Sequence, residues 1–303
     1  MIDLATLVAP LDPQVFIDEH WPHQPYWSNE DVSGRASVLE SVPELESAEA
    51  AMAGAPKVLV FRPDGKTGEV PGAEAAMPLY KMGLTCYIGT RHIPILWESV
   101  RTLTSDLGLP DGAIKCEIFC SSGESGLTMH SDFDLNFALL VRGSKRWRIA
   151  PNDHIRNQTA VCKRGKDEQV DPHQLELADK VPFPDSMPSD STELTFGDGG
   201  LLFMPRGWWH ETKAEGECLQ VNFVVNWPQW RQVLTAGLER RLLADPEWRE
   251  YAYDLFGSEE RRDAAIKAYA ERLRSLRAIL DVDDYEALAR DLLKISPLRP
   301  PKP

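Results

Sequence analysis

The 303-residue sequence lacks any hydrophobic run of the roughly 20 residues that a transmembrane helix needs. Its first residues, MIDLATLVAPLDPQVF, also lack the basic segment and the small-residue cleavage site of a secretory signal peptide. We therefore expect a soluble protein with no membrane-bound part. Nothing in the sequence directs it out of the cytoplasm, so we expect a cytoplasmic location.

Basic residues are few. The chain has 33 Lys and Arg against 47 Asp and Glu, a formal net charge of -14 at pH 7. A field of this sign repels phosphate backbones and favours cationic partners. Direct binding of nucleic acid through a broad basic surface is therefore disfavoured.

Cysteine is also scarce, and no two cysteines form a CxxC pair. This spacing indicates neither a disulfide framework nor a thiolate zinc site. We expect reduced and mostly buried thiols at all five positions: Cys86, Cys116, Cys120, Cys162 and Cys218.

Short apolar runs separated by Gly and Pro dominate residues 57–228. The runs are KVLVF, LTCYIG, AIKCEIFCS, Asn136 to Val141, KRWRIA, GLLFMP and CLQVNFVVN. Many short strands in succession predict a β-sandwich or barrel. One amphipathic helix, Ile93 to Leu107, interrupts the strands, and the polar residues 163–193 predict a long excursion between two of them.

The two ends of the chain have a different sequence pattern. Residues 1–56 predict helical and extended segments that pack on the core, with Asp12 as the cap before a first-turn Pro13. Residues 229–296 predict helices, and residues 297–303 an extended tail. Apolar residues recur at helical spacing in the 229–296 region: Leu234, Leu238, Leu242, Leu273, Leu276, Ile279 and Leu280.

Three residues form a candidate metal site. The run Met129 to Val141 alternates polar or small residues with apolar ones, which predicts a strand with His130 and Asp132 on one face. A third ligand would complete a 2-His-1-carboxylate triad, which leaves positions open on the metal. His210 is the candidate, because it follows an apolar strand, a Pro-Arg-Gly turn and two tryptophans.

Each part of this pattern is weak alone, since an HxD or a lone histidine in an aromatic strand occurs often by chance. Their combination on an all-β chain favours a metal site. The other histidines lie in helix-like or loop segments without a partner at ligand spacing, and we expect structural or surface roles for them: His20, His23, His92, His154 and His173.

The run HSDFDLNFALLVRGSKRWRIAP, with PRGWWHET and CLQVNF, resembles the JmjC/cupin-like 2-oxoglutarate oxygenases. It is most similar to the protein hydroxylases of the asparaginyl-hydroxylase and ribosomal-oxygenase type, and the segment FIDEHWPHQPY resembles the N-terminal lead-in of that group. The resemblance covers about residues 113–227. It implies a mainly β fold, a double-stranded β-helix (jelly-roll or cupin) core with helical additions, and Fe(II) on His130, Asp132 and His210.

The resemblance also implies a set of cosubstrate residues. Lys145 stands where the family pairs a cation with the C5 carboxylate of 2-oxoglutarate, and burial of a dicarboxylate requires such a cation. Asn136 and Asn222 match amides that orient the cosubstrate, although both fit equally well as hydrogen-bonded asparagines inside a barrel. Tyr87 matches a tyrosine on an early strand whose hydroxyl donates to the same carboxylate. Thr128 could donate likewise, but the family's hydroxyl more often stands one residue earlier, where this chain has Leu127.

The implied activity is an Fe(II)- and 2-oxoglutarate-dependent dioxygenase that uses O2 to hydroxylate a side chain of a protein or peptide, with release of succinate and CO2. The acidic charge would suit a basic target. Three alternatives stay open: an oxygenase of a free amino acid or natural-product intermediate, a non-oxidative metal-binding cupin, which would not need Lys145, and a binding module.

Two further expectations concern surfaces. In related hydroxylases the C-terminal helices pair two subunits, which implies a homodimer through residues 229–296; alternatively, these helices cap one end of the barrel. Trp208, Trp209 and the loop from Lys163 to Asp190 are expected to shape the entrance of the site.

Overall fold

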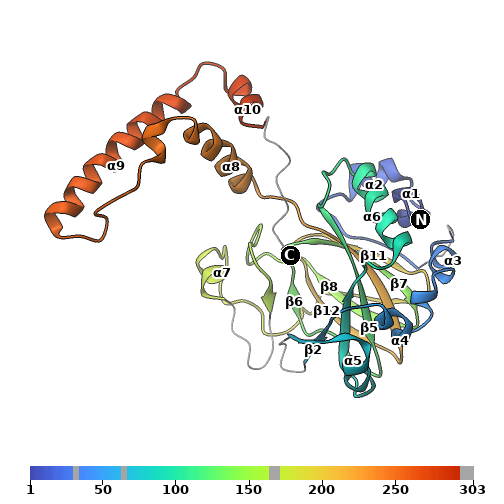
Figure 1. The fold of residues 1–303 in the computed structure, drawn as a ribbon. Coiled ribbons are helices and arrows are strands. Elements are labelled where there is room, and N and C mark those ends of the chain that lie inside the picture. Colours follow the sequence, from blue (N-terminus) through green and yellow to red (C-terminus); the bar gives the residue numbers. More distant parts are fainter. Residues whose placement is uncertain (30–33, 63–66, 164–170, 294–303) are drawn as a thin grey trace. The chain divides into compact units, whose positions relative to one another are not determined.

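The computed structural model describes residues 1–29, 34–62, 67–163 and 171–293. The chain divides into two compact units, residues 1–226 and 227–303 (Figure 1). The first unit holds the strands and the N-terminal helices, and the second is helical. In the described part of the chain, no helix combines the length and the hydrophobicity that a bilayer span requires.

Two antiparallel sheets form the centre of the first unit. The larger sheet has the order β1 (Tyr26–Ser28), β11 (Leu201–Met204), β7 (Leu135–Arg142), β13 (Cys218–Val225), β5 (Ile114–Ser121), β4 (Thr85–Gly89), β2 (Val58–Phe61) and β3 (Thr67–Val70). The smaller sheet has the order β10 (Thr192–Phe196), β8 (Lys145–Ala150), β12 (Trp209–Ala214), β6 (His130–Ser131) and β9 (Cys162–Lys163).

The chain alternates between the two sheets from β5 to β8 and again from β10 to β13. Alternate crossing of this kind winds the strands into a double-stranded β-helix. The predicted fold class, a jelly-roll or cupin core with helical additions, is confirmed.

The two faces of the larger sheet pack against different partners because successive side chains of a strand point to opposite faces. On β7, Phe137 and Leu139 join the large core that includes the N-terminal helices. Ala138 and Leu140 instead pack with Trp147 of the smaller sheet. The space between the sheets is therefore the interior of the barrel, and the helices cover its outside.

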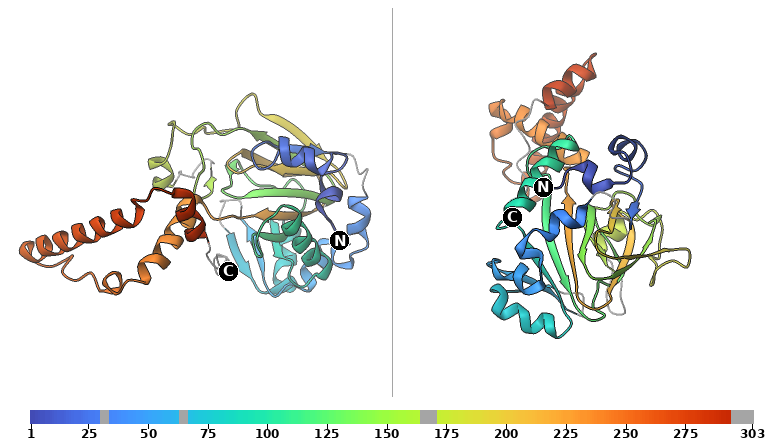
Figure 2. Two further views of the ribbon diagram at one scale, coloured as in Figure 1. Left: turned by 90° about the horizontal axis from the view of Figure 1, so that it is seen from above. Right: turned by 90° about the vertical axis from the view of Figure 1, so that its right-hand side faces the viewer.

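Seven helical segments precede β5 among the residues that the structure describes. They are α1 (Leu4–Val8), α2 (Pro13–Glu19), α3 (Arg35–Glu40), η1 (Pro43–Leu45), α4 (Ala48–Ala53), α5 (Gly72–Lys81) and α6 (Pro94–Asp106). Figure 2 shows them gathered on one side of the strands. The predicted cap is present, since Asp12 accepts the backbone N–H groups of Gln14 and Val15 at 2.8 and 3.3 Å.

Two elements differ from the sequence prediction. The run Met129 to Val141 is not one strand: β6 ends at Ser131, the chain bends, and β7 begins at Leu135 in the other sheet. A period-two pattern continues across such a crossing, so the pattern cannot reveal it. Helix α5 was not predicted, because its Gly72 and Pro78 are residues that typically indicate turns.

The excursion predicted for residues 163–193 lies between β9 and β10 and contains one short helix, α7 (Pro172–Glu176). Residues 164–170 lie outside the described part. All five cysteines are buried, as predicted.

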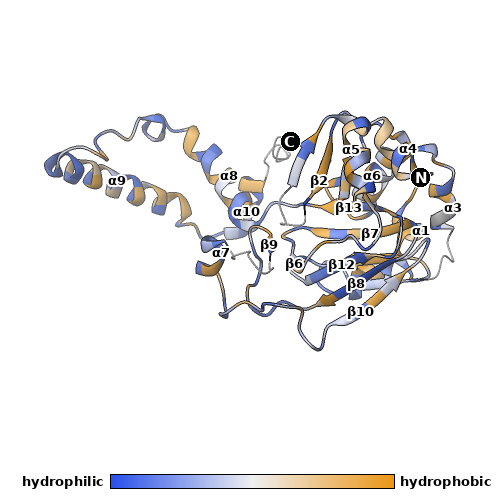
Figure 3. Cartoon of the chain, turned by 90° about the horizontal axis from the view of Figure 1, so that it is seen from below, coloured by the Kyte–Doolittle hydropathy of each residue, from blue (hydrophilic) through white to orange (hydrophobic). Residues whose placement is uncertain are grey.

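The second unit consists of α8 (Trp230–Leu243), η2 (Pro246–Arg249), α9 (Glu259–Leu280) and α10 (Tyr285–Leu293). Helices are therefore confirmed in this region, while the predicted tail at 297–303 lies outside the described residues. Helices α8 and α10 contact each other, with an ion pair of 2.9 Å between Arg241 and Asp291. Along α9, hydrophobic residues recur among hydrophilic ones (Figure 3).

An aromatic cluster fixes the N-terminal segment on the larger sheet, and Phe137 lies at its centre. Its ring centroid is 4.7 Å from that of Phe203, 5.7 Å from Phe16 and 6.3 Å from Trp21. Phe137→Ala should lower the free energy of unfolding by about 3–5 kcal/mol, because it leaves a cavity at a side chain that is 0% exposed. Urea denaturation measures this. The control Met82→Ala, at a side chain 75% exposed, should change it by less than about 0.5 kcal/mol.

Candidate metal centre

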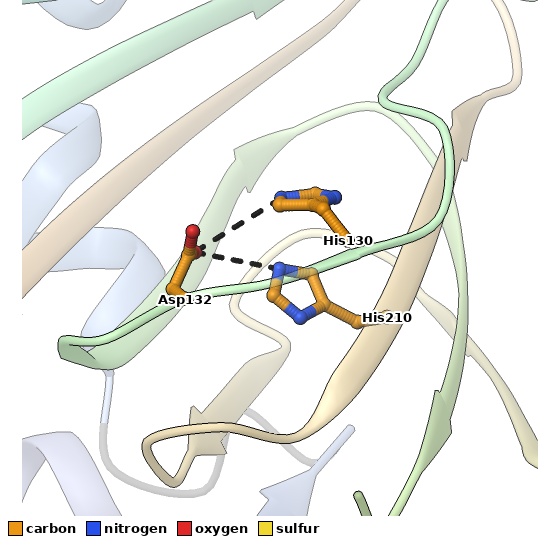
Figure 4. Close-up of side chains that lie close together, drawn as sticks. All are labelled: His130, Asp132 and His210. Carbon is orange, nitrogen blue, oxygen red and sulfur yellow. Dashed lines mark ion pairs between the residues drawn. The ribbon is translucent and has the colours of Figure 1, made fainter. Parts of the chain in front are cut away.

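Strand pairing brings the three predicted metal ligands together. His130 of β6 lies directly opposite His210 of β12, and their ring centroids are 4.1 Å apart. Asp132 follows the end of β6, with its Oδ2 atom 4.0 Å from His130 Nε2 and 3.5 Å from His210 Nε2. Figure 4 shows the three side chains converging. Their ligand atoms all lie within 4.8 Å of one another, close enough to hold one ion.

Backbone hydrogen bonds orient both imidazoles. His130 Nδ1 lies 2.7 Å from the carbonyl oxygen of Thr128, and His210 Nδ1 lies 3.0 Å from that of Trp208. A carbonyl oxygen can only accept a hydrogen bond, so each Nδ1 carries the proton. The lone pair on each Nε2 is thereby directed toward Asp132 and is available to a metal.

The protonation states also suit a metal. Burial, aided by the neighbouring His210, lowers the pKa of His130 to about 4, so this ring is neutral at pH 7. Burial alone would raise the pKa of Asp132, but its contacts with His210 and His130 outweigh that effect and lower it to about 2. A carboxylate with imidazole nitrogens fits a first-row divalent ion such as Fe(II). The metal roles themselves stay predictions.

A cavity of about 380 Å³ opens beside these residues. Tyr87, Thr128, Asn136 and Asn222, the four predicted polar cosubstrate residues, all line it. Asn136 was expected on the same strand face as His130, but it belongs to β7 in the opposite sheet and reaches the cavity from there. The two sheets therefore contribute opposite walls.

Lys145 is buried behind this cavity. Its side chain belongs to a residue only 3% exposed, and Nζ lies 5.8 Å from the ring centroid of Phe119, a cavity-lining residue, and 5.5 Å from that of Trp147. Among the described residues, the Lys145 ammonium group has no hydrogen-bonded or ion-pair partner. Burial lowers its pKa. A buried ammonium without an anion is costly, so the site is suited to an anionic ligand.

The polar groups of the wall differ in how they are engaged. The Tyr87 hydroxyl donates to Glu117 rather than standing free, and burial raises the pKa of Glu117. Asn222 Oδ1 accepts from Gln220 Nε2 at 2.5 Å. Within the described structure, Asn136 Oδ1 is buried without a hydrogen-bond partner. The cosubstrate roles of these residues stay predictions.

Sequence reasoning missed two carboxylates of the cavity, Glu117 and Asp134. Burial, with the charges of Asp132 and Glu117, raises the pKa of Asp134 to about 7. Glu117 alternates with apolar Cys116 and Ile118 in a strand, so period two places it on the opposite face from them, together with Phe119.

The expectation for the tryptophans is wrong. Trp209 is 1% exposed and packs with Phe183 and Ile155 in a separate small core, and Trp208 packs between the sheets. Among the described residues of the expected loop, Lys163 lines the cavity.

Comparison with known proteins gives a family match and several relatives. The family model described as a cupin-like domain matches residues 22–229. The Bacillus subtilis (strain 168) protein named "Uncharacterized protein YxbC" is 24% identical over 293 residues, which cover 89% of this chain and 84% of that one. The Drosophila melanogaster "Jumonji C domain-containing protein 5" is 28% identical over 145 residues, 42% of this chain and 34% of that one.

Solved structures of Escherichia coli YcfD are also similar. One has a TM-score of 0.49 and 18% identity, covering 87% of this chain and 68% of that chain. Another, whose description names a ribosomal oxygenase, has a TM-score of 0.47 and 17% identity, covering 97% of this chain and 75% of that chain.

Replacement of Asp132 tests the centre directly. Asp132→Ala should weaken Mn(II) binding by more than the roughly 10–100-fold that changing a ligand's hydrogen-bond partner costs, because it removes the anionic donor. Electron paramagnetic resonance of free Mn(II) measures the affinity. Asp134→Asn alters a carboxylate of the same cavity that is not placed at ligand distance. Its affinity for Mn(II) should therefore fall by less than about 10-fold. Equal losses would count against the three-residue centre.

Proposed function

This chain belongs to the family of proteins with a cupin-like domain, and from that premise we propose that it is an Fe(II)- and 2-oxoglutarate-dependent dioxygenase. The predicted JmjC/cupin-like resemblance is confirmed at the level of the family. The proposed reaction hydroxylates a side chain of a protein or peptide and converts 2-oxoglutarate and O2 into succinate and CO2. The observation that carries the proposal is Lys145, a buried cation without a partner among the described residues, beside a 2-His-1-carboxylate arrangement.

The three ligands would occupy one face of the metal, which leaves positions for a chelating cosubstrate and O2. Iron and 2-oxoglutarate, when bound, supply the chemistry: reduction of O2 by two electrons from the oxidative decarboxylation and two from the substrate C–H bond. The protein need not provide a general base. Its residues hold the ion, orient the cosubstrate and shield the cavity from bulk water.

Lys145 separates this proposal from a non-oxidative cupin. A dicarboxylate bound at the metal would place its second carboxylate in the barrel, where its desolvation would be prohibitive unless a cation paired with it. Lys145 is a buried cation of that interior, and its Nζ lies over Phe119 in the cavity wall. A site for isomerisation or hydrolysis would carry the cost of this buried charge without using it.

We propose a basic protein or peptide as the substrate. Two carboxylates besides the metal ligand, Glu117 and Asp134, line the cavity, and the whole chain carries a net charge of -14. The net charge attracts a cationic partner and disfavours direct contact with nucleic acid, and the two carboxyl groups can accept hydrogen bonds from a basic side chain. A free amino acid or natural-product intermediate is the competing substrate class. A cytoplasmic location is also proposed, which the five buried free cysteines support.

The helical unit supports the proposal of a homodimer. Ile266, Tyr269 and Leu273 share one face of α9 and are 59%, 61% and 46% exposed, and Phe256 before this helix is 99% exposed. An apolar face of this kind is stabilised when a second helix covers it. Pairing of two copies through these helices would provide that cover.

Lys145→Met tests whether the buried ammonium group binds 2-oxoglutarate. Anaerobic Fe(II) and 2-oxoglutarate should give the wild-type protein a weak visible charge-transfer band. Lys145→Met should raise the Kd for 2-oxoglutarate on the order of 10²–10³-fold, since loss of one partner of a buried ion pair costs about 3–5 kcal/mol. Arg146→Met removes a neighbouring cation that pairs instead with Glu215 at 3.0 Å, and it should leave the band unchanged.

Succinate formation and mass spectrometry decide between the substrate classes. Succinate formation should rise with basic peptides more than with neutral peptides or free amino acids, and mass spectrometry should find a 16-Da addition on the peptide. Absence of both the band and succinate would refute the oxygenase. Stimulation by free amino acids alone would leave the oxygenase and overturn the protein substrate.

Paired substitutions on α9 test the dimer. Light scattering of the wild type should give twice the chain mass of 34.0 kDa. The double variant Ile266→Glu, Leu273→Glu should give the mass of one chain, because charge on both contact positions opposes burial. The double variant Ala268→Glu, Ser275→Glu has the same spacing on the opposite face of α9 and should stay dimeric. A monomeric wild type would contradict the proposed homodimer.

A further inference from the structure

The segment that carries two of the three metal ligands makes only a few strand hydrogen bonds. β6 consists of His130 and Ser131 only, and Asp132 already lies outside it. Its ladder partners are Trp209 and His210 on β12, and Cys162 and Lys163 on β9. Two residue pairs on each side leave the direction of Asp132 weakly determined, since a strand end frays unless other groups hold it.

A glutamine from outside the sheets supplies the missing contacts. Gln158 belongs to the loop between β8 and β9, and it is 0% exposed, as is Ser131. Gln158 Nε2 donates to the carbonyl oxygen of Ser131 at 2.7 Å, and Ser131 Oγ donates to Gln158 Oε1 at 2.8 Å. One amide group therefore holds both the backbone and the side chain of the residue between His130 and Asp132.

The orientation of this amide is fixed by its surroundings. Nε2 also donates to the carbonyl oxygen of Ala160 at 3.0 Å, so its two N–H groups meet two carbonyls. A flipped amide would set its own oxygen against both carbonyls, which only accept. The contact to Ser131 is thus specific for a side chain with two donors and one acceptor.

The same network reaches the third ligand. Arg206, in the turn between β11 and β12, donates to the backbone carbonyls of Asn157, at 2.9 Å, and of Gln158. Gly207, in that turn, donates its N–H to the carbonyl of Asp132 at 2.8 Å. His210 follows on β12, so one set of hydrogen bonds joins both chain segments that bear ligands.

We infer that Gln158 is a positioning residue of the metal centre. The Ser131 carbonyl and the Asp132 nitrogen belong to one planar peptide group. Holding that carbonyl sets the direction in which the Asp132 side chain leaves the backbone. His130 and Asp132 flank Ser131, and its side chain is held by Gln158 while theirs converge on His210. The amide thus stabilises the geometry in which the three ligand atoms meet. The inference rests on the metal site of the proposed function, but not on the cosubstrate or substrate.

Gln158→Glu is the primary test because it keeps the size of the side chain and removes the N–H donors. Titration with Co(II), followed by visible absorption, should show a Kd raised about 10–100-fold, the range for loss of an outer-sphere partner of a metal ligand. Ser131→Ala removes only the hydroxyl, is less disruptive to folding, and should raise the Kd in the same direction by a smaller factor.

Gln174 of α7 offers a matched control. It is 1% exposed, donates from Nε2 to Thr159 Oγ1 at 2.9 Å, and accepts from Thr159 N at 3.3 Å. Gln174→Glu is therefore the same change at an equally buried glutamine that does not bond to the ligand segment. Its Kd for Co(II) should stay near the wild-type value even if both glutamine variants melt at a lower temperature.

The outcomes separate this inference from the proposed function. A Kd for Gln158→Glu and Ser131→Ala equal to that of the wild type, or an equal rise in Gln174→Glu, overturns the positioning role. A wild type that does not bind Co(II) overturns both the metal centre and the inference. A raised Kd in Gln158→Glu and Ser131→Ala but not in Gln174→Glu, together with no succinate from the wild type, supports the inference and refutes only the oxygenase.

Discussion

The short pairing between β6 and β12 is the contact on which the centre depends, because it sets His130 against His210. β6 is too short to be rigid by itself, whereas β12 is paired with β8 along its whole length. The pairing of β8 with β12 therefore fixes the position of His210. A few specific hydrogen bonds from Gln158 and Gly207 hold the β6 segment, with the other two ligands, against it. Placement of this kind suits a site that must hold its geometry before a metal arrives.

Stability and chemistry are divided between the two faces of the larger sheet. Its outer face and the N-terminal helices bury a continuous apolar core, which includes the aromatic group around Phe137. Its inner face carries polar side chains such as Gln220 and Asn222, and the smaller sheet adds Lys145. Burial of such groups is unfavourable unless each is hydrogen-bonded or paired. The apolar outer face offsets this cost, and a polar barrel interior is tolerated where a ligand binds.

Local patterns in the sequence were sufficient for much of the molecule. Period-two runs predicted most of the strands, the Asp12-Pro13 pair predicted the start of α2, and residue chemistry identified the three candidate ligands. Lys145 came from the family resemblance. They failed where a pattern had two structural solutions. An alternating run through residues 129–141 fits one strand or two strands in opposite sheets, and a tryptophan beside a candidate ligand fits either an entrance or a core. Trp209 proved to be core.

The sequence by itself determined which donor atoms and charges the chain contains, and the alternation that sorts side chains onto two faces. The tertiary structure alone decided which of them meet. Tyr87 and Glu117 are 30 residues apart, and Ser131 and Gln158 are 27 apart. Backbone preferences act over a few residues, whereas contacts of this range depend on which strands become neighbours. The Tyr87 hydroxyl is therefore engaged by a carboxylate, and a glutamine with no motif of its own holds the ligand segment.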